Sequence, residues 1–330
     1  MTHGDQQADH ERWTSHDLQP FPHPPGGARW LRRRRRTTMV DTTSSTRAIV
    51  LGGGGSAGIA WESGLLSALL EAGVDLGAAE LVVGTSAGSV VAVNLRAGRM
   101  DETTLRGQLA QEAPSPGRAA SAMPEFSAER FMELMAEAAR EATSPEAGRA
   151  AIGKRALVAA VAPSEEEWMA QIAAQLPQQW PEGRVAVTAV DTATGGLAVF
   201  DARSGVPLER AVAASCTVPA VFPPVHVDGR AYMDGGMRSA TNADLAAGHD
   251  RVLVVSCNPE PPTSPFGPTL EQSLRLIEES GSALHVTADA ASRAAFGANP
   301  LDPARRLPSF EAGLAQGRLL ADRTRQFWDA

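Results

Sequence analysis

From residue 46 onward, short apolar runs alternate with longer stretches in which apolar residues recur at helical spacing. The runs at Arg47–Leu51 and Glu80–Val83 predict buried strands. Ile59–Ala72 and Ser86–Ala97 predict helices, because their aliphatic residues return every three or four positions. Strands that alternate with helices are typical of parallel sheets with right-handed crossover connections. We therefore expect an α/β fold.

The alternation stops at residues 100–182, which are acidic, alanine-rich and interrupted by prolines. This composition predicts a helical insertion at about 100–182. Arg184–Val190 and Leu197–Asp201 predict two further strands, joined as a hairpin around a Thr-Gly-Gly turn. The remaining predicted elements are a helix at Pro207–Ser215, a buried strand at Arg251–Ser256, a long helical stretch at Gln272–Ala298 and a closing helix at Phe310–Trp328.

Residues 1–45 differ from the rest of the chain in containing a proline-rich run and the arginine block Arg32–Arg36. No apolar segment follows the arginines, so we do not expect a signal peptide. Three interpretations remain for this region. It is a disordered tail upstream of a natural start at Met39, a basic anchor for a membrane surface, or a metal site, although its histidines lack ligand spacing.

Composition excludes several classes of function. The net charge is −8, and the seven arginines of residues 1–38 leave the remainder more acidic than the whole. An acidic body repels nucleic-acid phosphates, so we expect no nucleic-acid partner. The two cysteines, Cys216 and Cys257, do not make a disulfide framework, which favours the reducing cytoplasm. No stretch approaches the length of a membrane span.

The segment Gly84-Thr85-Ser86-Ala87-Gly88 lies between a predicted strand and a predicted helix. A nucleophile elbow needs a serine in a tight turn with small neighbours, and the glycines at positions 84 and 88 supply them. The following helix points its N-terminus at the serine, which favours developing negative charge there. Ser86 is therefore a candidate nucleophile. The alternative is a tight turn with an ordinary serine.

A second glycine-rich turn, Gly52–Gly58, also joins a strand to a helix. Consecutive glycines let several backbone N–H groups face one anion. That anion is either the oxyanion of an attacked ester or the pyrophosphate of a dinucleotide, since Gly53, Gly55 and Gly58 fit a GxGxxG spacing. Asp75 would then contact the ribose, but a second strand ending at the acid is missing. A purely structural turn is the third interpretation.

A serine nucleophile needs a base. Beyond the N-terminal region the chain has three histidines, His226, His249 and His285, and none lies in a motif. Asp234 is followed by Gly235 and Gly236, which predict a tight exposed turn. A carboxylate within hydrogen-bond reach of the serine can accept its proton directly. On spacing alone, however, an Asp-Gly-Gly sequence is more often only a turn.

Together, the GGGGSAG, GTSAG and DGG segments occur in the order typical of the patatin-like phospholipase family, and the chain resembles that family over about residues 46–300. Val187–Gly195 and Ala213–Pro224 add to the resemblance. It implies a three-layer α/β/α sandwich with a mostly parallel central sheet and a helical insertion. It also implies a catalytic domain at 46–310, with residues 311–330 forming a C-terminal helix packed on it.

The resemblance further implies a Ser86–Asp234 dyad that works without histidine, metal or cofactor, with Gly53, Gly54 and Gly55 forming the oxyanion hole. The implied substrate is a lipid acyl ester, met in transient contact with a membrane surface by a cytoplasmic or peripheral protein. The chain departs from many members at Ala57, where they carry Arg or Lys. This change removes a positive charge near the substrate and puts a preference for anionic head groups in doubt.

Two other functions stay open on the sequence alone. One is a conventional Ser-His-Asp α/β-hydrolase, with His249 or His285 following the acid. The other is a non-catalytic protein that binds lipid or a dinucleotide. Asp191 is predicted to be structural, holding its turn together with Thr192 and Thr194. The apolar cluster at Phe126–Met135 is either a lid or ordinary helix packing.

Overall fold

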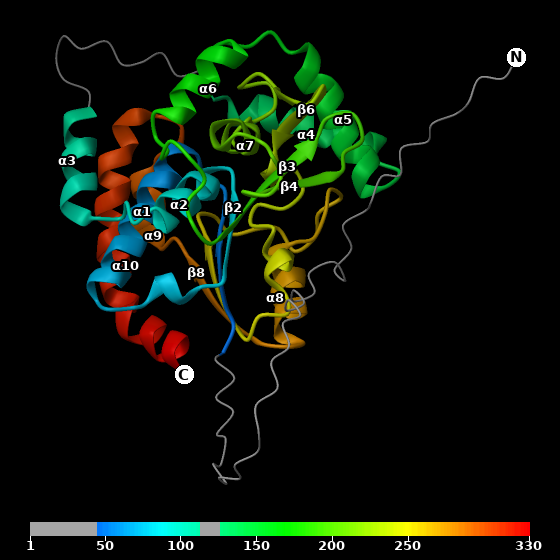
Figure 1. The fold of residues 1–330 in the computed structure, drawn as a ribbon. Coiled ribbons are helices and arrows are strands. Elements are labelled where there is room, and N and C mark those ends of the chain that lie inside the picture. Colours follow the sequence, from blue (N-terminus) through cyan, green and yellow to red (C-terminus); the bar gives the residue numbers. More distant parts are fainter. Residues whose placement is uncertain (1–44, 113–125) are drawn as a thin grey trace, which may run out of the picture. The chain divides into compact units, whose positions relative to one another are not determined.

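The computed structural model describes residues 45–112 and 126–330, so the predictions for residues 1–44 lie outside the described residues. Within them, eight strands form one sheet in the order β5-β6-β3-β2-β1-β7-β8, with β4 paired to β3 (Figure 1). The strands are β1 (Arg47–Leu51), β2 (Leu81–Thr85), β3 (Arg184–Asp191), β4 (Leu197–Phe200), β5 (Val225–Val227), β6 (Arg230–Asp234), β7 (Arg251–Ser256) and β8 (Ser282–Thr287).

The α-helices flank this sheet. They are α1 (Gly55–Glu71), α2 (Ala87–Arg96), α3 (Glu102–Glu112), α4 (Ala128–Glu141), α5 (Pro145–Val158), α6 (Glu165–Ala173), α7 (Leu208–Ser215), α8 (Leu270–Glu278), α9 (Ala290–Phe296) and α10 (Arg306–Asp329). Two short 3-10 turns matter for the site, η2 (Gly235–Met237) and η3 (Ala243–Ala246).

Most of the sheet is parallel. β3, β2, β1, β7 and β8 are paired in parallel, whereas β4 and β6 are antiparallel to β3 and β5 is antiparallel to β6. In the parallel part the carboxyl ends of the strands meet at one edge, and β1 and β2 both lead directly into helices there. This arrangement confirms the predicted α/β fold with a mostly parallel central sheet flanked by helices.

Alternate residues of each strand enter two different cores, because successive side chains of a strand point to opposite faces. Ile49 and Leu51 belong to the core covered by α1, α2 and α7, whereas Ala48 and Val50 belong to the core covered by α8 and η3. All four side chains are fully buried. At about 25 cal/mol per Å² of apolar surface, burial on both faces is the main favourable term that fixes the strand register.

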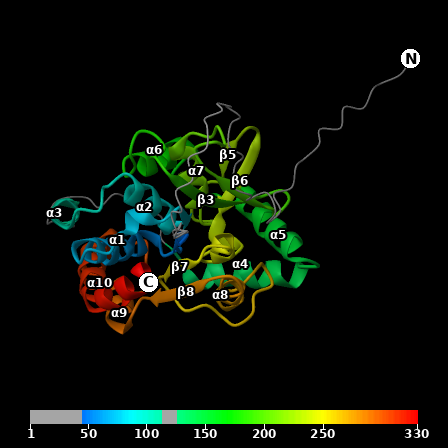
Figure 2. The same cartoon turned by 60° about the horizontal axis from the view of Figure 1, so that its bottom comes forward.

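The helical insertion supplies both faces as well. Residues of α4 and α5 pack with Val190 and Met233 on the side of α8, whereas Trp168 and Ile172 of α6 join the core beneath α1 and α2. Figure 2 shows α1, α2 and α10 on one side of the sheet and α4, α5 and α8 on the other. The first helix of the insertion, α3, lies against α10, and its Arg106 pairs with Glu311 of α10 at 2.8 Å.

The closing helix α10 packs along α1 at very short range. A Cβ atom added at Gly64 would lie 2.3 Å from the Phe310 carbonyl oxygen, and one added at Gly313 would lie 2.2 Å from the Trp61 oxygen. Two glycines therefore let the backbones touch. Because α1 carries the glycine-rich turn at its N-terminus, α10 fixes the position of that turn.

Several sequence-based predictions need correction. The stretch Gln272–Ala298 is not one helix: α8 ends at Glu278, β8 follows, and α9 begins at Ala290. Ser280 and Gly281 lie between the end of α8 and β8, and β8 then pairs in parallel with β7 along its whole length. A tertiary pairing thus overrides a helical composition. The β5–β6 hairpin was also not predicted, whereas β1, β2, β3, β4 and β7 were.

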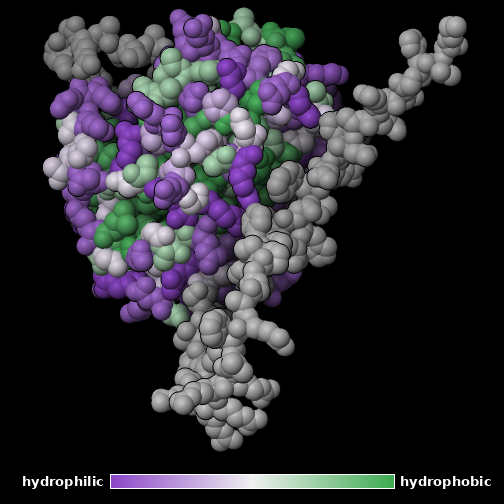
Figure 3. Space-filling view, in the orientation of Figure 1, coloured by the Kyte–Doolittle hydropathy of each residue, from purple (hydrophilic) through white to green (hydrophobic). Residues whose placement is uncertain are grey.

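Apolar side chains are scattered over the surface of the described residues. The large exposed ones are Met132, Leu157, Val158, Val199, Leu276 and Leu319. On the face drawn in Figure 3, hydrophobic and hydrophilic residues are interspersed in small areas. In residues 45–112 and 126–330, no helix combines the length and the apolar character needed to cross a bilayer.

Candidate active site

Ser86 occupies a strained turn between β2 and α2. Its backbone has φ 52° and ψ −121°, a conformation that is rare for residues other than glycine. The flanking glycines make the turn possible. A Cβ at Gly84 would lie 2.5 Å from the Ser89 Cα, and one at Gly88 would lie 2.1 Å from the Leu51 oxygen. The GTSAG spacing therefore reflects two backbone contacts that no side chain can enter.

The backbone groups of Ser86 are held by neighbouring side chains. Its N–H donates to the Ser215 Oγ at 2.9 Å, and its carbonyl oxygen accepts from the Ser89 Oγ at 2.6 Å and from the Cys216 Sγ at 3.1 Å. Ser86 is only 9% exposed, so these partners replace water. They also stabilise a conformation that by itself costs about 1–3 kcal/mol.

The sheet register places Ser86 and Asp234 on either side of one residue. Thr85 of β2 pairs with Thr188 of β3, and the next residue of β3, Ala189, pairs with Asp234 of β6. Ser86 is the next residue after Thr85. Because neighbouring strands lie about 4.8 Å apart, the backbones of Ser86 and Asp234 are about two strand spacings apart, within reach of facing side chains.

The carboxyl group of Asp234 is buried and hydrogen-bonded. Its side chain accepts from the Gly236 N–H at 2.7 Å, and its own N–H donates to the Thr217 carbonyl oxygen at 2.9 Å. Burial raises the pKa of Asp234 to about 7, against the opposing effect of hydrogen bonds from Ser86 and Gly236. A carboxyl with that pKa gains and loses its proton near neutral pH, as a general base must.

Asp234 is held in a turn that needs glycine. A Cβ at Gly235 would lie 2.4 Å from the Thr188 Oγ1, and one at Gly236 would lie 3.0 Å from the Asp234 Oδ1. The DGG sequence thus lets the chain turn away from β6 directly after the acid.

The glycine-rich turn lies beside the Ser86 side chain. A Cβ at Gly53 would lie 3.4 Å from the Ser86 Cβ and 3.9 Å from its Oγ. The Gly53 N–H, however, donates to the Ala240 oxygen at 2.9 Å. Within the described residues, the N–H groups of Gly54 and Gly55 have no protein acceptor. These two amides, at the N-terminus of α1, are available to an anion.

Residues below the turn leave no room for side chains. A Cβ at Gly54 would lie 2.3 Å from the Cys257 Sγ, and one at Gly58 would lie 2.9 Å from the same atom. The buried carboxyl of Glu62 accepts from the Gly52 N–H at 3.1 Å, and burial raises its pKa well above the usual range. The raised pKa favours the neutral form of this acid, which fixes the start of the turn with less negative charge beneath it.

The segment after the turn is covered by a loop near the C-terminus. The Pro300 carbonyl oxygen accepts from the Ser56 Oγ at 3.0 Å and from the Ala57 N–H at 2.9 Å. Ala57 itself is fully buried. The position where many relatives carry a cation is thus occupied by a small side chain under a carbonyl oxygen.

The three histidines lie away from Ser86. His285 lies on β8, where it pairs with Val254 of β7. β8 is three strands from β2, which places His285 about 14 Å from the serine strand. Its Nε2 bonds with the Ser256 Oγ at 2.8 Å. His249 precedes β7 and so lies at the amino end of the parallel strands, whereas Ser86 lies at their carboxyl end. Its Nδ1 bonds with the Ala246 oxygen. The third, His226 on β5, is paired with Glu165 of α6.

Asp75 and Asp191 also have identifiable structural surroundings. Asp75 follows α1 and precedes β2, so the full length of α1 separates it from the glycine-rich turn. Asp191 accepts from the N–H and Oγ1 of Thr194 at 2.8 and 2.9 Å, which confirms its structural role. Thr192 does not share it, because its hydroxyl donates to the Ala231 oxygen.

The apolar cluster of α4 packs inward for the most part. Phe131 and Met135 contact the core formed with Met233 and Met237, the residues that flank the Asp234 turn, whereas Met132 is 64% exposed. This packing favours the structural interpretation of the cluster over a lid.

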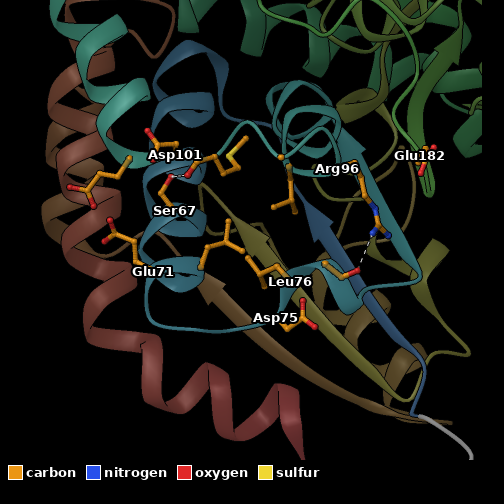
Figure 4. A pocket seen from close by; sticks show the side chains of 13 residues that line it. Ser67, Glu71, Asp75, Leu76, Arg96, Asp101 and Glu182 are labelled. Carbon is orange, nitrogen blue, oxygen red and sulfur yellow. Dashed lines mark hydrogen bonds between the residues drawn. The ribbon is translucent and has the colours of Figure 1, made fainter.

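A cavity of about 650 Å³ lies elsewhere, between α1 and the segment after α2 (Figure 4). Its lining includes Glu71, Asp75, Asp101 and Glu182, and it opens near the amino end of β2. Ser86 lies at the other end of that strand, so this cavity is not the site of the serine chemistry. In the described part of the chain, no group of three or more His, Cys, Asp or Glu side chains is arranged to hold a metal ion.

A model of the patatin-like phospholipase family matches residues 49–247, a segment that contains the carboxyl end of β1, the Ser86 turn and the Asp234 turn. The chain belongs to this family. Membership supports a lipid-hydrolase function for the patatin-like chain. A search among curated proteins found no match.

Several solved structures are similar to this patatin-like chain. VipD from Legionella pneumophila matches with 13% identity and a TM-score of 0.39 over 85% of this chain and 67% of VipD. The type III effector protein ExoU matches with 17% identity and a TM-score of 0.38, over 85% of this chain and 53% of ExoU. Full-length ExoU from Pseudomonas aeruginosa, in complex with SpcU, matches with 13% identity and a TM-score of 0.34, over 86% and 52%. The chain spans about two thirds of VipD and about half of ExoU.

Sequence reasoning missed the residues that hold the two turns of the patatin-like site. Ser215, Cys216 and Thr217 bond with the backbones of Ser86 and Asp234, and Asn242 lies beneath both turns. The only signal in the sequence was indirect. The first three belong to the segment Ala213–Pro224, whose resemblance to the family had no chemical explanation.

Proposed function

We propose that this protein is a serine acyl hydrolase that cleaves lipid acyl esters with a Ser86–Asp234 dyad. The observation that supports it most is the strand register. It brings the serine turn after β2 and the buried Asp234 carboxyl of β6, with its pKa of about 7, to the two sides of Ala189 in β3. The family match supports a lipid ester as the substrate class.

In the first half-reaction, the Ser86 Oγ attacks the ester carbonyl carbon while its proton passes to the Asp234 carboxylate. The carbonyl oxygen becomes an oxyanion, which accepts hydrogen bonds from the free N–H groups of Gly54 and Gly55. Gly53 contributes mainly its missing side chain, which leaves room beside the Ser86 Oγ. Collapse of the intermediate breaks the bond to the alcohol, which leaves with the proton from Asp234.

In the second half-reaction, water attacks the acyl-enzyme carbonyl and Asp234 accepts the water proton. The intermediate releases the fatty acid, and the proton returns to the Ser86 Oγ. Each oxyanion donor removed costs a typical enzyme about 10²–10³ in kcat, so the two free amides are a large part of the proposed rate acceleration. No step requires a metal or a cofactor.

The site also suggests which lipids fit. Ala57 carries no charge, and its N–H and the Ser56 hydroxyl are already bonded to the Pro300 oxygen. This arrangement favours recognition of the acyl ester over recognition of an anionic head group. A transient contact with a membrane surface brings such substrates to a cytoplasmic or peripheral enzyme, and the two buried free cysteines fit a reducing compartment.

A fluorophosphonate probe tests the proposal directly, because it reacts with an activated serine and needs no knowledge of the natural lipid. We expect stoichiometric labelling at Ser86 in the full chain and none in Ser86→Ala. Esterase activity on a short-chain chromogenic ester should disappear in the same variant. Ser309→Ala is the matched control, since that serine is buried on α10 with no hydrogen-bond partner among the described residues. Absence of labelling together with ester turnover in Ser86→Ala would refute the proposal, and lipid binding without labelling would favour a non-catalytic binding protein.

A further inference from the structure

The structure contains a buried amide that joins the serine turn to the aspartate turn. Asn242 precedes η3 and is fully buried. Its Nδ2 donates to the Thr85 Oγ1 at 3.1 Å and to the Gly235 oxygen at 3.2 Å. Thr85 directly precedes Ser86, and Gly235 directly follows Asp234. One side chain therefore contacts the immediate neighbours of both proposed catalytic residues.

A third contact closes this network. The Asn242 Nδ2 also lies 3.3 Å from the Thr188 Oγ1 and 2.9 Å from the Ser239 oxygen, so its two hydrogens are shared among four acceptors. The hydroxyls of Thr188 and Thr85 are 2.9 Å apart. Thr188 belongs to β3, the strand between the serine strand and the aspartate strand. The network thus crosses all three strands at the level where the two turns begin.

The orientation of the amide is determined by a neighbouring cation. Arg238 Nη1 donates to the Asn242 Oδ1 at 2.7 Å, while the same guanidinium pairs with Asp244. Because the oxygen faces Arg238, the NH₂ group must face the threonines and Gly235. A flipped amide would place two donors against the guanidinium.

The backbone of Asn242 supports a dedicated role. It adopts φ 50° and ψ 37°, in the left-handed region that asparagine tolerates better than most side chains. Glycine would relieve that strain, so the conformation alone does not require an amide side chain. The contacts of the side chain do.

The dyad is held from the other face of the sheet as well. The Ser215 Oγ accepts the Ser86 N–H, and the Thr217 oxygen accepts the Asp234 N–H. The α7 segment belongs to the core beneath α1, whereas η3 belongs to the opposite core beside α8. The two supports therefore act on the two turns from opposite sides.

We propose that Asn242 is a positioning residue that sets the separation of the Ser86 hydroxyl and the Asp234 carboxyl, because the two hydrogens of its amide are shared among acceptors on both turns, including the Thr85 Oγ1 and the Gly235 oxygen. This inference rests on the proposed function of the dyad. Its loss alters the geometry of proton transfer and leaves substrate binding unchanged, because the side chain is buried beneath the turns.

The test compares Asn242→Gly with Asp228→Gly. Asp228 also has a left-handed backbone, φ 48°, but lies exposed in the β5–β6 turn, so it controls for relief of backbone strain. We expect Asn242→Gly to lower kcat and the rate of fluorophosphonate labelling by about 10- to 100-fold with KM within twofold, the loss expected when buried polar groups lose a partner. Asp228→Gly should match the wild type. Labelling and turnover are measured per folded molecule, so a purely structural role would leave both rates unchanged.

Thr188→Val keeps the test decisive if Asn242→Gly does not fold. Valine has nearly the shape of threonine and removes only the hydroxyl that joins Thr85 to Asn242. We expect a fall in kcat of about fivefold or more with unchanged KM. Wild-type kcat and labelling rates in folded Asn242→Gly, or in Thr188→Val where the first variant is unfolded, would overturn the positioning role. Failure of the wild type itself to be labelled at Ser86 would instead refute the proposed function, and this role with it.

Discussion

Two aspartates on neighbouring strands have similarly low solvent exposure, and yet their pKa values are shifted in opposite directions. Asp191 ends β3 and is 4% exposed, whereas Asp234 ends β6 and is 2% exposed. Burial alone raises the pKa of a carboxyl. For Asp191 that effect is overcome by hydrogen bonds from Thr194 and by the Arg230 guanidinium, whose Nε lies 2.7 Å away, so its pKa is lowered.

Asp234 has fewer partners. The Gly236 N–H and the Ser86 hydroxyl lower its pKa, but no cation contributes, and burial raises the value to about 7. The comparison teaches that depth does not by itself make a base. A structural carboxylate differs from the proposed catalytic one in the donors that meet it, including a guanidinium, and in being less completely enclosed by protein, so that desolvation raises the pKa of Asp234 more.

The largest expected effect comes from removing the proton acceptor at one site and not the other. Asp234→Asn should lower kcat by about 10⁴-fold or more, because an amide cannot accept the Ser86 proton. Asp191→Asn should leave kcat within about threefold, since Asp191 bonds only with its own turn and Arg230. Initial rates on one ester, normalised to folded protein, check both. Equal losses in the two variants would remove the distinction.

The same two variants should change stability in opposite directions. A raised pKa in the folded state means that ionising Asp234 destabilises the fold as pH rises from about 4 to 7, by up to about 4 kcal/mol at one pKa unit per 1.36 kcal/mol. Asp234→Asn should therefore be more stable than the wild type at pH 8, with the difference vanishing near pH 4.

A lowered pKa has the reverse consequence. Asp191 stabilises the fold above its ordinary pKa of 3.8, and this contribution is lost as pH falls through the lower folded value. Asp191→Asn should thus be less stable at pH 7, by about 1–3 kcal/mol. Urea unfolding at pH 4, 6 and 8 measures both, with the exposed Asp322→Asn as control. A destabilised Asp234→Asn at pH 8 would contradict the desolvation argument.

The rate should also depend on pH in a way that an ordinary aspartate would not produce. The proposed base works only when ionised, so kcat/KM should rise through about pH 7 and reach a plateau near pH 9. At pH 5 about 1% of Asp234 is ionised, which predicts a rate about 100-fold below the plateau. Rates are measured from pH 5 to 9, with unfolding followed in parallel. A flat profile over this range would show that the carboxyl has a normal pKa in the reacting enzyme.

The sequence was sufficient to locate both turns, because each depends on local chemistry. Glycine is required at positions 84, 88 and 235 because a Cβ added there would lie only 2.1 to 2.5 Å from backbone or hydroxyl atoms, and such requirements leave a visible pattern. The first strands and helices were predicted for a similar reason, since burial on two faces imposes a regular apolar pattern.

Other features depend on partners far away in the chain and leave no local pattern. Asn242 lies 157 residues from Thr85, and Ser215 lies 129 residues from Ser86. No chemical pattern in the neighbourhood of either residue distinguishes it from an ordinary polar position, although Ser215 lies in the segment Ala213–Pro224 that resembles the family. The helix predicted at Gln272–Ala298 was wrong for the same reason: β8 forms because β7 offers it a parallel partner. Long-range pairing thus determines which local turns meet.

The smallest expected effect concerns a half-buried titratable group, His285. Partial burial lowers its pKa, which favours the neutral ring, and its Nε2 bonds with the Ser256 Oγ at 2.8 Å. Its place on β8, three strands from β2, leaves it outside the reach of Ser86. His285→Ala should therefore keep kcat within twofold while costing about 1 kcal/mol of stability through the lost hydrogen bond. His226→Ala, an exposed histidine on β5, is the matched control. A loss of 10³-fold or more in kcat in His285→Ala alone would identify a Ser-His-Asp triad. The carboxyl of Asp234 would then serve to orient a histidine.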